Sequence, residues 1–432
     1  MLSKTKQSMI EFAESEMLIA KDCKYPLNDY RTRLNNNVLI VGGSGCGKTR
    51  NVVTPNIAQA VGSYIISDPK GDLYNKYREY LKLRGYKVLL VDFTHPERSV
   101  CYNPLHYVNT SQEIMKLANL IIDDKITASA NVDMYWDRIS MVYLQAIIAY
   151  MKEAGHHPMT FNEILRLVEY GIRDSDNDDC KTSRLSRMFD VLKSKNPGSW
   201  ACRQFNNANA APYRTYDTMR STLNAKFSKM ASDELDTMMN GDPFDFNSMA
   251  LEKTAVFVVV SDTDRTMDTL ANIFFSQAIH SLCEFADNKC KDNRLPIPVR
   301  FILDDFATNC KIDEFPRIIS SIRSRAISVM LMVQSEAQLA QGYGDDASTI
   351  IANCDTYAYL GGSDLTTAAN IGERTDTDIR DILSMPIGSC YVFRRGSKHV
   401  YTQLLDGGEY IAQMHEAVNA HKLSERTSPL NG

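Results

Sequence analysis

The stretch "LNNNVLIVGGSGCGKTRNVVTPN", residues 34–56, joins an apolar run to a glycine-rich turn. Val38–Val41 predicts a buried parallel strand, and the residues that follow fit the spacing G-x-x-x-x-G-K-[ST] from Gly42 to Thr49. A turn of this kind between a strand and a helix presents backbone N–H groups and the positive end of the helix to phosphate oxygens. The sequence therefore predicts a site for a nucleoside triphosphate.

Each residue type in this loop has a physical role. Glycine lets the backbone turn its N–H groups inward onto the phosphate oxygens. We expect Lys48 to reach the β- and γ-phosphates and the Thr49 hydroxyl to bind Mg²⁺. The predicted nucleotide-binding residues are Gly42, Gly43, Ser44, Gly45, Cys46, Gly47, Lys48 and Thr49.

Length and composition bound the remaining choices. A chain of 432 residues favours two or more domains, and a net charge of -5 requires any nucleic-acid surface to be local. The 10 cysteines include no C-x-x-C pair and no cluster at zinc spacing, so we expect reduced thiols in a cytosolic protein. Apolar runs such as Ala255–Val260 fall far short of the ~20 residues of a membrane span, so we expect no transmembrane segment.

Strand and helix patterns divide the chain into three stretches. Residues 1–110 alternate strands and helices, which predicts a parallel sheet covered by helices. Residues 111–250 show long helical periodicities instead, which predicts an inserted all-α domain. Residues 251–432 return to strands and helices and are expected to complete the sheet. The predicted class is α/β, with a mostly parallel sheet and a nucleotide-binding domain that is discontinuous in sequence.

Polar residues follow two further buried strands. In "RFILDDF", residues 300–306, Asp304 is expected near Mg²⁺ and Asp305 is expected to orient the attacking water. An ordinary strand end with solvated acids is the alternative. Gln334 ends the strand in "SVMLMVQ", residues 328–334, where its amide either senses the γ-phosphate or caps the next helix.

The turn "SDPKGDLYNK", residues 67–76, follows another predicted strand. Asp-Pro and Lys-Gly-Asp are ordinary turn residues. This turn nevertheless leaves the same sheet edge as the phosphate loop, where ligands bind in open α/β sheets. Lys70 therefore either faces nucleotide or substrate, or simply belongs to the turn.

The predicted helical insert has a local excess of cations between residues 181 and 230. Only Asp190 and Asp217 oppose them. Either these cations form a solvated helical face, or they form a surface that contacts DNA or docks a substrate. The cations are Lys181, Arg184, Arg187, Lys193, Lys195, Arg203, Arg214, Arg220, Lys226 and Lys229.

The order of these motifs resembles the type IV coupling proteins of bacterial conjugation, in their TraG-like group. The resemblance rests on "NNNVLIVGGSGCGKTRNVVTPN", "GSYIISDPKGDLY", "RLPIPVRFILDDFATN" and "IRSRAISVMLMVQSEAQL", and it extends from about Arg31 to Tyr401. It implies a RecA-like, FtsK/HerA-related ATPase that uses ATP and Mg²⁺ and assembles as a hexamer, with a monomer as the other state in isolation. The implied activity is to receive relaxase-bound single-stranded DNA and feed it to a type IV secretion channel.

The resemblance also implies a role for Arg323 in "SIRSRAIS", residues 321–328. In a ring assembly, Arg323 is expected to reach the γ-phosphate held by the neighbouring subunit, where a guanidinium stabilises developing charge. Arg325 is the second candidate. The alternative is a surface arginine that interacts favourably with the C-terminal end of a helix.

Two features depart from the usual pattern of this family. Asp305 stands where the family usually has glutamate, so the water-orienting carboxylate is one methylene shorter and the turnover rate is in question. Barely thirty polar residues precede the nucleotide domain, where the family usually has membrane helices. Either an anchor was removed, or the chain docks on a separate membrane subunit, and we expect a cytoplasmic position at the inner face of the membrane.

Three functions stay open from the sequence. A DNA-translocating ATPase of conjugation is favoured. The alternatives are an ATP-dependent receptor or translocator of effector proteins for type IV secretion, and a weakly hydrolysing receptor whose nucleotide stabilises assembly. Stimulation of hydrolysis by single-stranded DNA separates the first function from the second, and the turnover rate separates the third.

Overall fold

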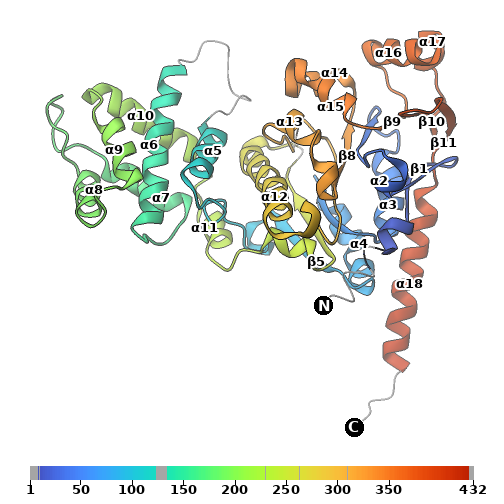
Figure 1. Ribbon diagram of the computed structural model, residues 1–432, viewed down its shortest axis with the longest axis horizontal. Helices are drawn as coiled ribbons and strands as arrows, with labels where there is room; N and C mark the ends of the chain where they lie inside the picture. The colour runs from blue at the N-terminus through green and yellow to red at the C-terminus, as the bar shows by residue number, and fades with distance from the viewer. Residues whose placement is uncertain are drawn as a thin grey trace. The chain divides into compact units, whose positions relative to one another are not determined.

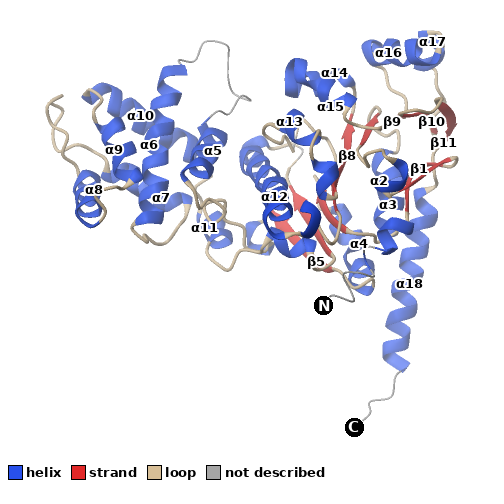
Figure 2. Ribbon diagram, viewed as in Figure 1, coloured by secondary structure: helices blue, strands red, loops and turns tan. Residues whose placement is uncertain are grey.

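The apolar runs of the sequence form the strands of one large sheet (Figures 1 and 2). The structure is a computed structural model, and it describes residues 8, 10–122, 134–228, 230–261, 263–308 and 310–427. The chain divides into two units. The sheet unit contains Met1–Leu90, Asp245–Asp262 and Ala278–Gly432, and the helical unit contains Val91–Phe244 and Thr263–Gln277.

The large sheet is mostly parallel. Its strand order among the described residues is β11-β10-β9-β3-β8-β7-β4-β6-β5. Parallel pairing joins β9, β3, β8, β7, β4 and β6, whereas β10 pairs antiparallel with both β9 and β11 at one edge. The strands are β3 (Val38–Val41), β4 (Ser63–Ser67), β5 (Lys87–Asp92), β6 (Thr254–Val259), β7 (Val299–Leu303), β8 (Ile327–Val333), β9 (Thr356–Tyr359), β10 (Ser389–Arg394) and β11 (Val400–Gln403).

The interior strands are buried along their whole length. Every residue of β3, β4, β6, β7, β8 and β9 is buried, as expected of a parallel sheet covered on both faces. The pairing aligns Val41 with Val333 and Leu303 with Leu331. The carboxyl ends of β3, β8 and β7 therefore lie at one edge, and the residues that follow these strands gather there.

Helices pack on the sheet through one apolar cluster. The helix after the phosphate loop consists of η1 (Lys48–Val53) and α3 (Thr54–Ala58), and α4 (Asp72–Leu83) follows β4. The C-terminal helix α18 (Gly407–Thr427) packs against all three (Figure 1). A hairpin of β1 (Glu16–Ala20) and β2 (Cys23–Pro26) joins the same cluster through Met17, Ile19 and Cys23.

The helical unit is organised around α6, which contacts five other helices of this unit. Tyr143 of α6 meets Tyr216 of α10 by a hydroxyl–hydroxyl hydrogen bond of 3.0 Å, and Phe189 of α8 stacks on Phe205 of α9 at 4.1 Å between ring centres. The helices are α5 (Ser111–Ile122), α6 (Met134–Glu153), α7 (Phe161–Tyr170), α8 (Arg184–Lys195), α9 (Trp200–Asn209), α10 (Tyr213–Phe227) and α11 (Asp233–Met239).

The predicted α/β class, with a mostly parallel sheet and a helical insert, is confirmed. The domain boundaries predicted after residues 110 and 250 stay predictions. Across the described residues, none of the helices combines the length and the apolar character needed to cross a lipid bilayer.

Candidate functional site

The phosphate loop follows β3 and turns directly into η1. Gly47 precedes η1 with φ +93°, a left-handed conformation that glycine adopts without strain. A Cβ at this position would also lie 2.6 Å from the Asn51 side-chain nitrogen. The sequence favours glycine here, because a side chain would force a strained backbone angle and would also displace the Asn51 side chain.

The Lys48 side chain is buried and extends back over the loop that precedes it. Its Nζ donates to the carbonyl oxygens of Gly42 at 2.6 Å and Gly43 at 3.1 Å. The residue is only 8% exposed, so its ammonium group is held over the loop. An ammonium group in this place supplies the positive charge that a bound phosphate requires.

Thr49 and Asp304 meet although they lie 255 residues apart in the sequence. The Thr49 hydroxyl donates to Asp304 Oδ2 at 2.6 Å. Asp304 Oδ1 accepts from the Asp305 backbone N–H at 3.1 Å. A hydroxyl and a carboxylate are oxygen ligands of the kind that Mg²⁺ prefers, so this pair fits the predicted metal site.

A cavity of about 710 Å³ opens at this edge of the sheet. This volume lies in the range of small-molecule sites. The predicted site residues that line it are Ser44, Gly45, Cys46, Gly47, Lys48, Thr49, Asp304, Asp305 and Gln334. Gly42 and Gly43 contribute their carbonyl groups to Lys48 instead. The structure thus brings most of the predicted residues together, while their individual roles stay predictions.

Asp305 begins a tight turn after β7. Its φ is +49°, and Ala307 in the same turn has φ +72°. The Thr308 backbone N–H donates to the Asp305 carbonyl at 3.1 Å and closes the turn. Left-handed backbone in residues other than glycine is uncommon, costs free energy, and clusters at functional sites.

Gln334 does not cap the helix that follows it, so the capping alternative is wrong. The N-cap of α14 (Glu336–Tyr343) is Ser335, whose side chain accepts from the Gln338 backbone N–H at 3.2 Å. The Gln334 backbone N–H donates to Gln338 Oε1 at 2.8 Å. The exposed Gln334 side chain lines the cavity.

The turn after β4 contributes a further wall of the cavity. Lys70 lines it together with Asp68. Asp68 accepts at 2.8 Å from the backbone N–H of Tyr74 in the first turn of α4. Burial raises the pKa of the Asp68 carboxyl above its usual range.

Arg323 lies at the opposite edge of the sheet from the phosphate loop of its own chain. It belongs to η6 (Ile322–Arg325), immediately before β8. β8 has seven residues, and at about 3.3 Å per residue it separates Arg323 from the site by roughly 20 Å. Arg323 is therefore too far from the phosphate loop of its own chain to contact a phosphate bound there.

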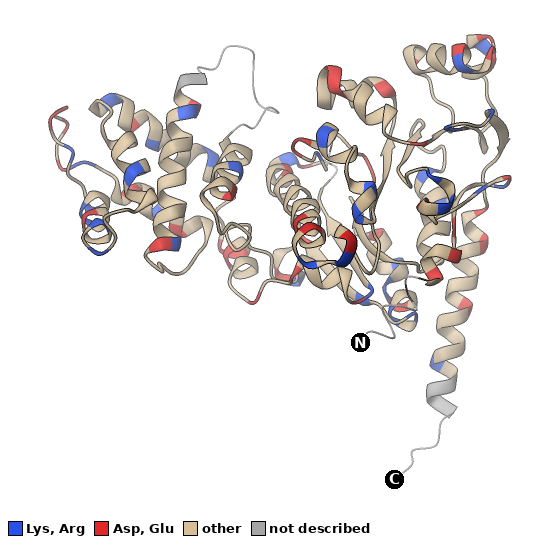
Figure 3. Cartoon of the chain, viewed as in Figure 1, with Lys and Arg blue, Asp and Glu red and all other residues tan. Residues whose placement is uncertain are grey.

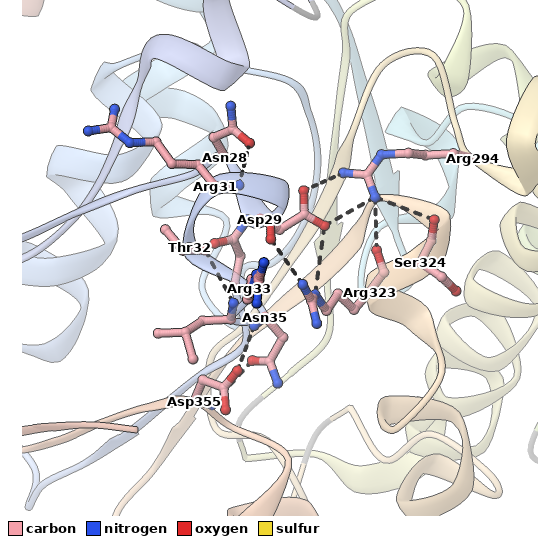
Figure 4. Close-up of polar contacts among 12 residues, drawn as sticks. Asn28, Asp29, Arg31, Thr32, Arg33, Asn35, Arg294, Arg323, Ser324 and Asp355 are labelled. Carbon is pink, nitrogen blue, oxygen red and sulfur yellow. Dashed lines mark hydrogen bonds and ion pairs between the residues drawn. The ribbon is translucent and has the colours of Figure 1, made fainter. Parts of the chain in front are cut away.

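The Arg323 guanidinium is held by Asp29 of α2 (Asp29–Thr32) (Figure 4). Its Nη2 donates to the Asp29 carbonyl at 2.9 Å, and its Nε lies 3.9 Å from Asp29 Oδ2. The Asp29 carboxylate also binds Arg294 at 2.7 and 3.1 Å. Arg325 instead pairs with Asp287 at 2.7 Å. The Arg323 side chain stays 40% exposed, which leaves it accessible to a neighbouring molecule.

Half of the cation cluster in the helical unit makes internal contacts. These cations are Lys181, which donates to the Ala211 carbonyl, Arg184, which lies over the Tyr170 ring, Arg187, which pairs with Asp174, Arg220, which pairs with Asp217, and Lys226, which donates to the Ile122 carbonyl. Lys193, Lys195, Arg203 and Arg214 are exposed, and Lys229 lies outside the described residues. Figure 3 marks the Lys and Arg positions in blue along the helices of this unit. The cluster is therefore partly structural and partly an exposed surface.

Comparisons with known proteins add family and fold. Residues 5–377 match the family described as "Type IV secretory system Conjugative DNA transfer". Among solved structures, the bacterial conjugative coupling protein TrwBdeltaN70 is 16% identical with a TM-score of 0.66, over 93% of this chain and 91% of that chain. No curated protein sequence matches the chain.

Two further solved structures share the fold. TrwB in complex with ADP and Mg²⁺ is 17% identical with a TM-score of 0.64, over 94% of this chain and 92% of that one. VirB4 of Thermoanaerobacter pseudethanolicus is 14% identical with a TM-score of 0.52, over 91% of this chain and 96% of that chain. The predicted RecA-like P-loop fold with a helical insert is thereby confirmed.

Proposed function

Because the chain belongs to the type IV secretory system conjugative DNA transfer family, we propose that it is a coupling ATPase that recruits relaxase-bound single-stranded DNA and drives it to a type IV secretion channel. The observation that carries the ATPase part is the contact between Thr49 and Asp304 beside the buried Lys48. This contact unites a phosphate-binding loop with an acidic strand end in one cavity.

Different groups of the site bind the phosphates and the metal ion. The loop from Gly42 to Gly47 cradles the phosphates through backbone N–H groups, and Lys48 neutralises the β- and γ-phosphate charge. Thr49 and Asp304 hold Mg²⁺, which when bound supplies positive charge at the phosphate oxygens. The TrwB structure with ADP and Mg²⁺ supports binding of a nucleotide and Mg²⁺ by this fold.

Asp305 accepts a hydrogen bond from the attacking water and orients it toward the γ-phosphate. Gln334 projects from the end of β8 and contacts the γ-phosphate side of the cavity. Both residues are exposed or half-buried at the cavity surface, where water and substrate reach them.

The active form is a homo-hexameric ring in which Arg323 completes the site of a neighbour. Support comes from the distance of Arg323 from its own phosphate loop and from its exposed guanidinium. A separate membrane subunit places the ring at the inner face of the membrane. Lys193, Lys195, Arg203 and Arg214 of the all-α insert, residues 111–250, face the DNA or relaxase, while residues 1–110 and 251–432 form the ATPase domain.

ATP hydrolysis by the full chain tests this function. With Mg²⁺ and single-stranded DNA we expect turnover that rises with added DNA, and a loss of roughly 100-fold or more in Lys48→Ala, which lacks the phosphate charge partner. Normal turnover in Lys48→Ala would reject the site. Stimulation by protein cargo in the absence of DNA would instead favour a translocator of effector proteins.

A further inference from the structure

The three residues that follow Asp305 in its turn pack against α14. Phe306 stacks on Tyr343 with 5.4 Å between ring centres. Ala307 lies against Gly342, where a Cβ would stand only 2.8 Å from the Ala307 Cβ. Thr308 accepts a hydrogen bond from the Gln338 side chain at 2.7 Å. The turn and the helix therefore run past each other in opposite directions with three successive contacts.

The Gln338 amide touches two different strand ends. Its oxygen accepts from the Gln334 backbone N–H at 2.8 Å, and its nitrogen donates to Thr308 Oγ1. The amide can lie only this way round, because a backbone N–H donates and requires the oxygen. One side chain thus ties the end of β8 to the turn after β7, and both segments line the nucleotide cavity.

The turn held by this amide contains left-handed backbone at two residues, and the strain falls mainly on Ala307 because aspartate adopts this conformation more readily. Asp305 and Ala307 both have positive φ, and such conformations persist only where the surrounding structure fixes them. Gly342 and Tyr343 fix the turn by packing, which is not directional. The Gln338 amide adds directional contacts at the residue whose N–H closes the turn on Asp305.

We propose that Gln338 is a positioning residue that holds Asp305 and Gln334 in their working geometry, acting through Thr308 on one side and the Gln334 backbone on the other. The proposal rests on the proposed ATPase function. Gln338 acts on the rate of the chemical step, because it fixes the groups that face the γ-phosphate while the phosphate loop itself stays intact.

Variants of the full chain test this proposal. Gln338→Leu removes both hydrogen bonds of the amide and keeps a side chain of similar size. Thr308→Val removes the hydroxyl and keeps the shape of the side chain, whereas Thr308→Ser keeps the hydroxyl. We expect kcat to fall roughly 10- to 100-fold in the first two, since small misplacements near the reacting atoms have effects of this size. Their double variant should fall no further, because the two groups form one contact. Thr308→Ser should stay within about twofold of the wild type.

Affinity and a matched surface variant complete the test. Binding of a fluorescent ATP analogue with Mg²⁺ should be unchanged in Gln338→Leu. Gln341→Leu, an exposed position on the same helix, should leave kcat unchanged. A loss of affinity with an unchanged kcat would make Gln338 a nucleotide contact and overturn the proposal. Equal losses in Thr308→Ser and Thr308→Val, or additive losses in the double variant, would also overturn it.

Hydrogen exchange separates this proposal from the ATPase function itself. In Gln338→Leu the amides of residues 303–308 should exchange about tenfold faster, while residues 42–53 should not change. Unchanged exchange in 303–308 would reject the role of Gln338 whatever the activity. A wild-type chain that hydrolyses no ATP would reject the proposed function, and the exchange result would still decide the role of Gln338.

Discussion

Cys46 places a thiol inside the phosphate loop. It lines the nucleotide cavity, and burial raises the pKa of its thiol above the ordinary value of 9.0, with the Lys48 ammonium lowering it in part. Because the thiolate is the reactive form, little of it exists at neutral pH, and its fraction keeps rising as the pH passes 9. The reactivity of the Cys46 thiol can therefore report whether nucleotide is bound in the cavity.

We predict that the rate of Cys46 alkylation by iodoacetamide rises from pH 7 to above pH 9. Bound Mg·ATP should protect the Cys46 thiol from this reagent. Mass spectrometry of the labelled peptides measures both effects. Cys180 is the internal reference, because it is half-buried and hydrogen bonds with Thr182 lower the pKa of its thiol. Equal labelling of Cys46 with and without nucleotide would contradict its place at the phosphates.

Asp305 gives a second prediction. Asp305→Asn should lose hydrolysis by roughly 100-fold or more and keep nucleotide affinity, because it removes the carboxylate that orients water. Asparagine tolerates the left-handed conformation of Asp305, so the loss reports chemistry and not misfolding. Asp305→Glu should keep or raise the rate. Steady-state kinetics and analogue binding measure both variants, and an active Asn variant would place the catalytic carboxylate elsewhere.

Part of the site could be predicted from residues alone. The spacing from Gly42 to Thr49 is local, so the sequence states it directly. Asp304 could be found because it ends an apolar strand. Gln338 and Asp68 could not be assigned in this way. The contacts of Gln338 depend on how α14 packs against a turn that follows another strand. The raised pKa of Asp68 depends on its burial, which no local pattern indicates.

At the element scale, η6 and α2 together hold the arginine proposed to act between subunits. Asp29 lies between Arg294 and Arg323, and its carboxylate is 9% exposed. Two guanidinium groups around one carboxylate leave a net positive charge near this edge of the sheet. Such an arrangement keeps Arg323 oriented while its own charge is only partly balanced.

Mixed rings test whether Arg323 acts in trans. Arg323→Ala subunits and Lys48→Ala subunits are each expected to be inactive, and mixing them should restore part of the turnover. Some interfaces would then pair an intact loop with an intact arginine. ATPase activity of rings shown to contain both variants is the measurement.

Arg325→Ala is the matched control for this experiment. Its half-buried guanidinium is bound to Asp287 at 2.7 and 2.8 Å and to the Ser321 carbonyl at 3.0 Å. It is therefore not presented to a neighbouring subunit, and its loss should leave turnover close to that of the wild type. No recovery in mixed rings, or an effect of Arg325→Ala equal to that of Arg323→Ala, would contradict a finger supplied by Arg323.

The position of Arg323 could be predicted from the sequence, but its contact with Asp29 could not. The segment 321–328 indicated an arginine at the start of a strand, and η6 followed by β8 agrees with that position. The contact with Asp29 was not predictable, because Asp29 lies 294 residues earlier in the chain and no local pattern links the two. Contacts of this separation depend on the strand order, which the sequence pattern does not state.

At the scale of the whole molecule, the sheet combines segments from both ends of the chain. β3 lies between β8 and β9, and β4 lies between β7 and β6. Alternating strands and helices predicted parallel pairing, since each crossover helix covers a face of the sheet. The strand order and the antiparallel edge at β10 and β11 were not predicted, because pairing between distant strands leaves no periodic signal.

The proposed function requires that ATP hydrolysis by the assembled rings moves single-stranded DNA. The direct measurement is displacement of streptavidin from the end of a biotinylated single strand by assembled rings of the full chain with Mg·ATP. We predict ATP-dependent displacement that is absent with ADP and in rings of Lys48→Ala subunits. ATP hydrolysis stimulated by DNA without any displacement of streptavidin would contradict this account.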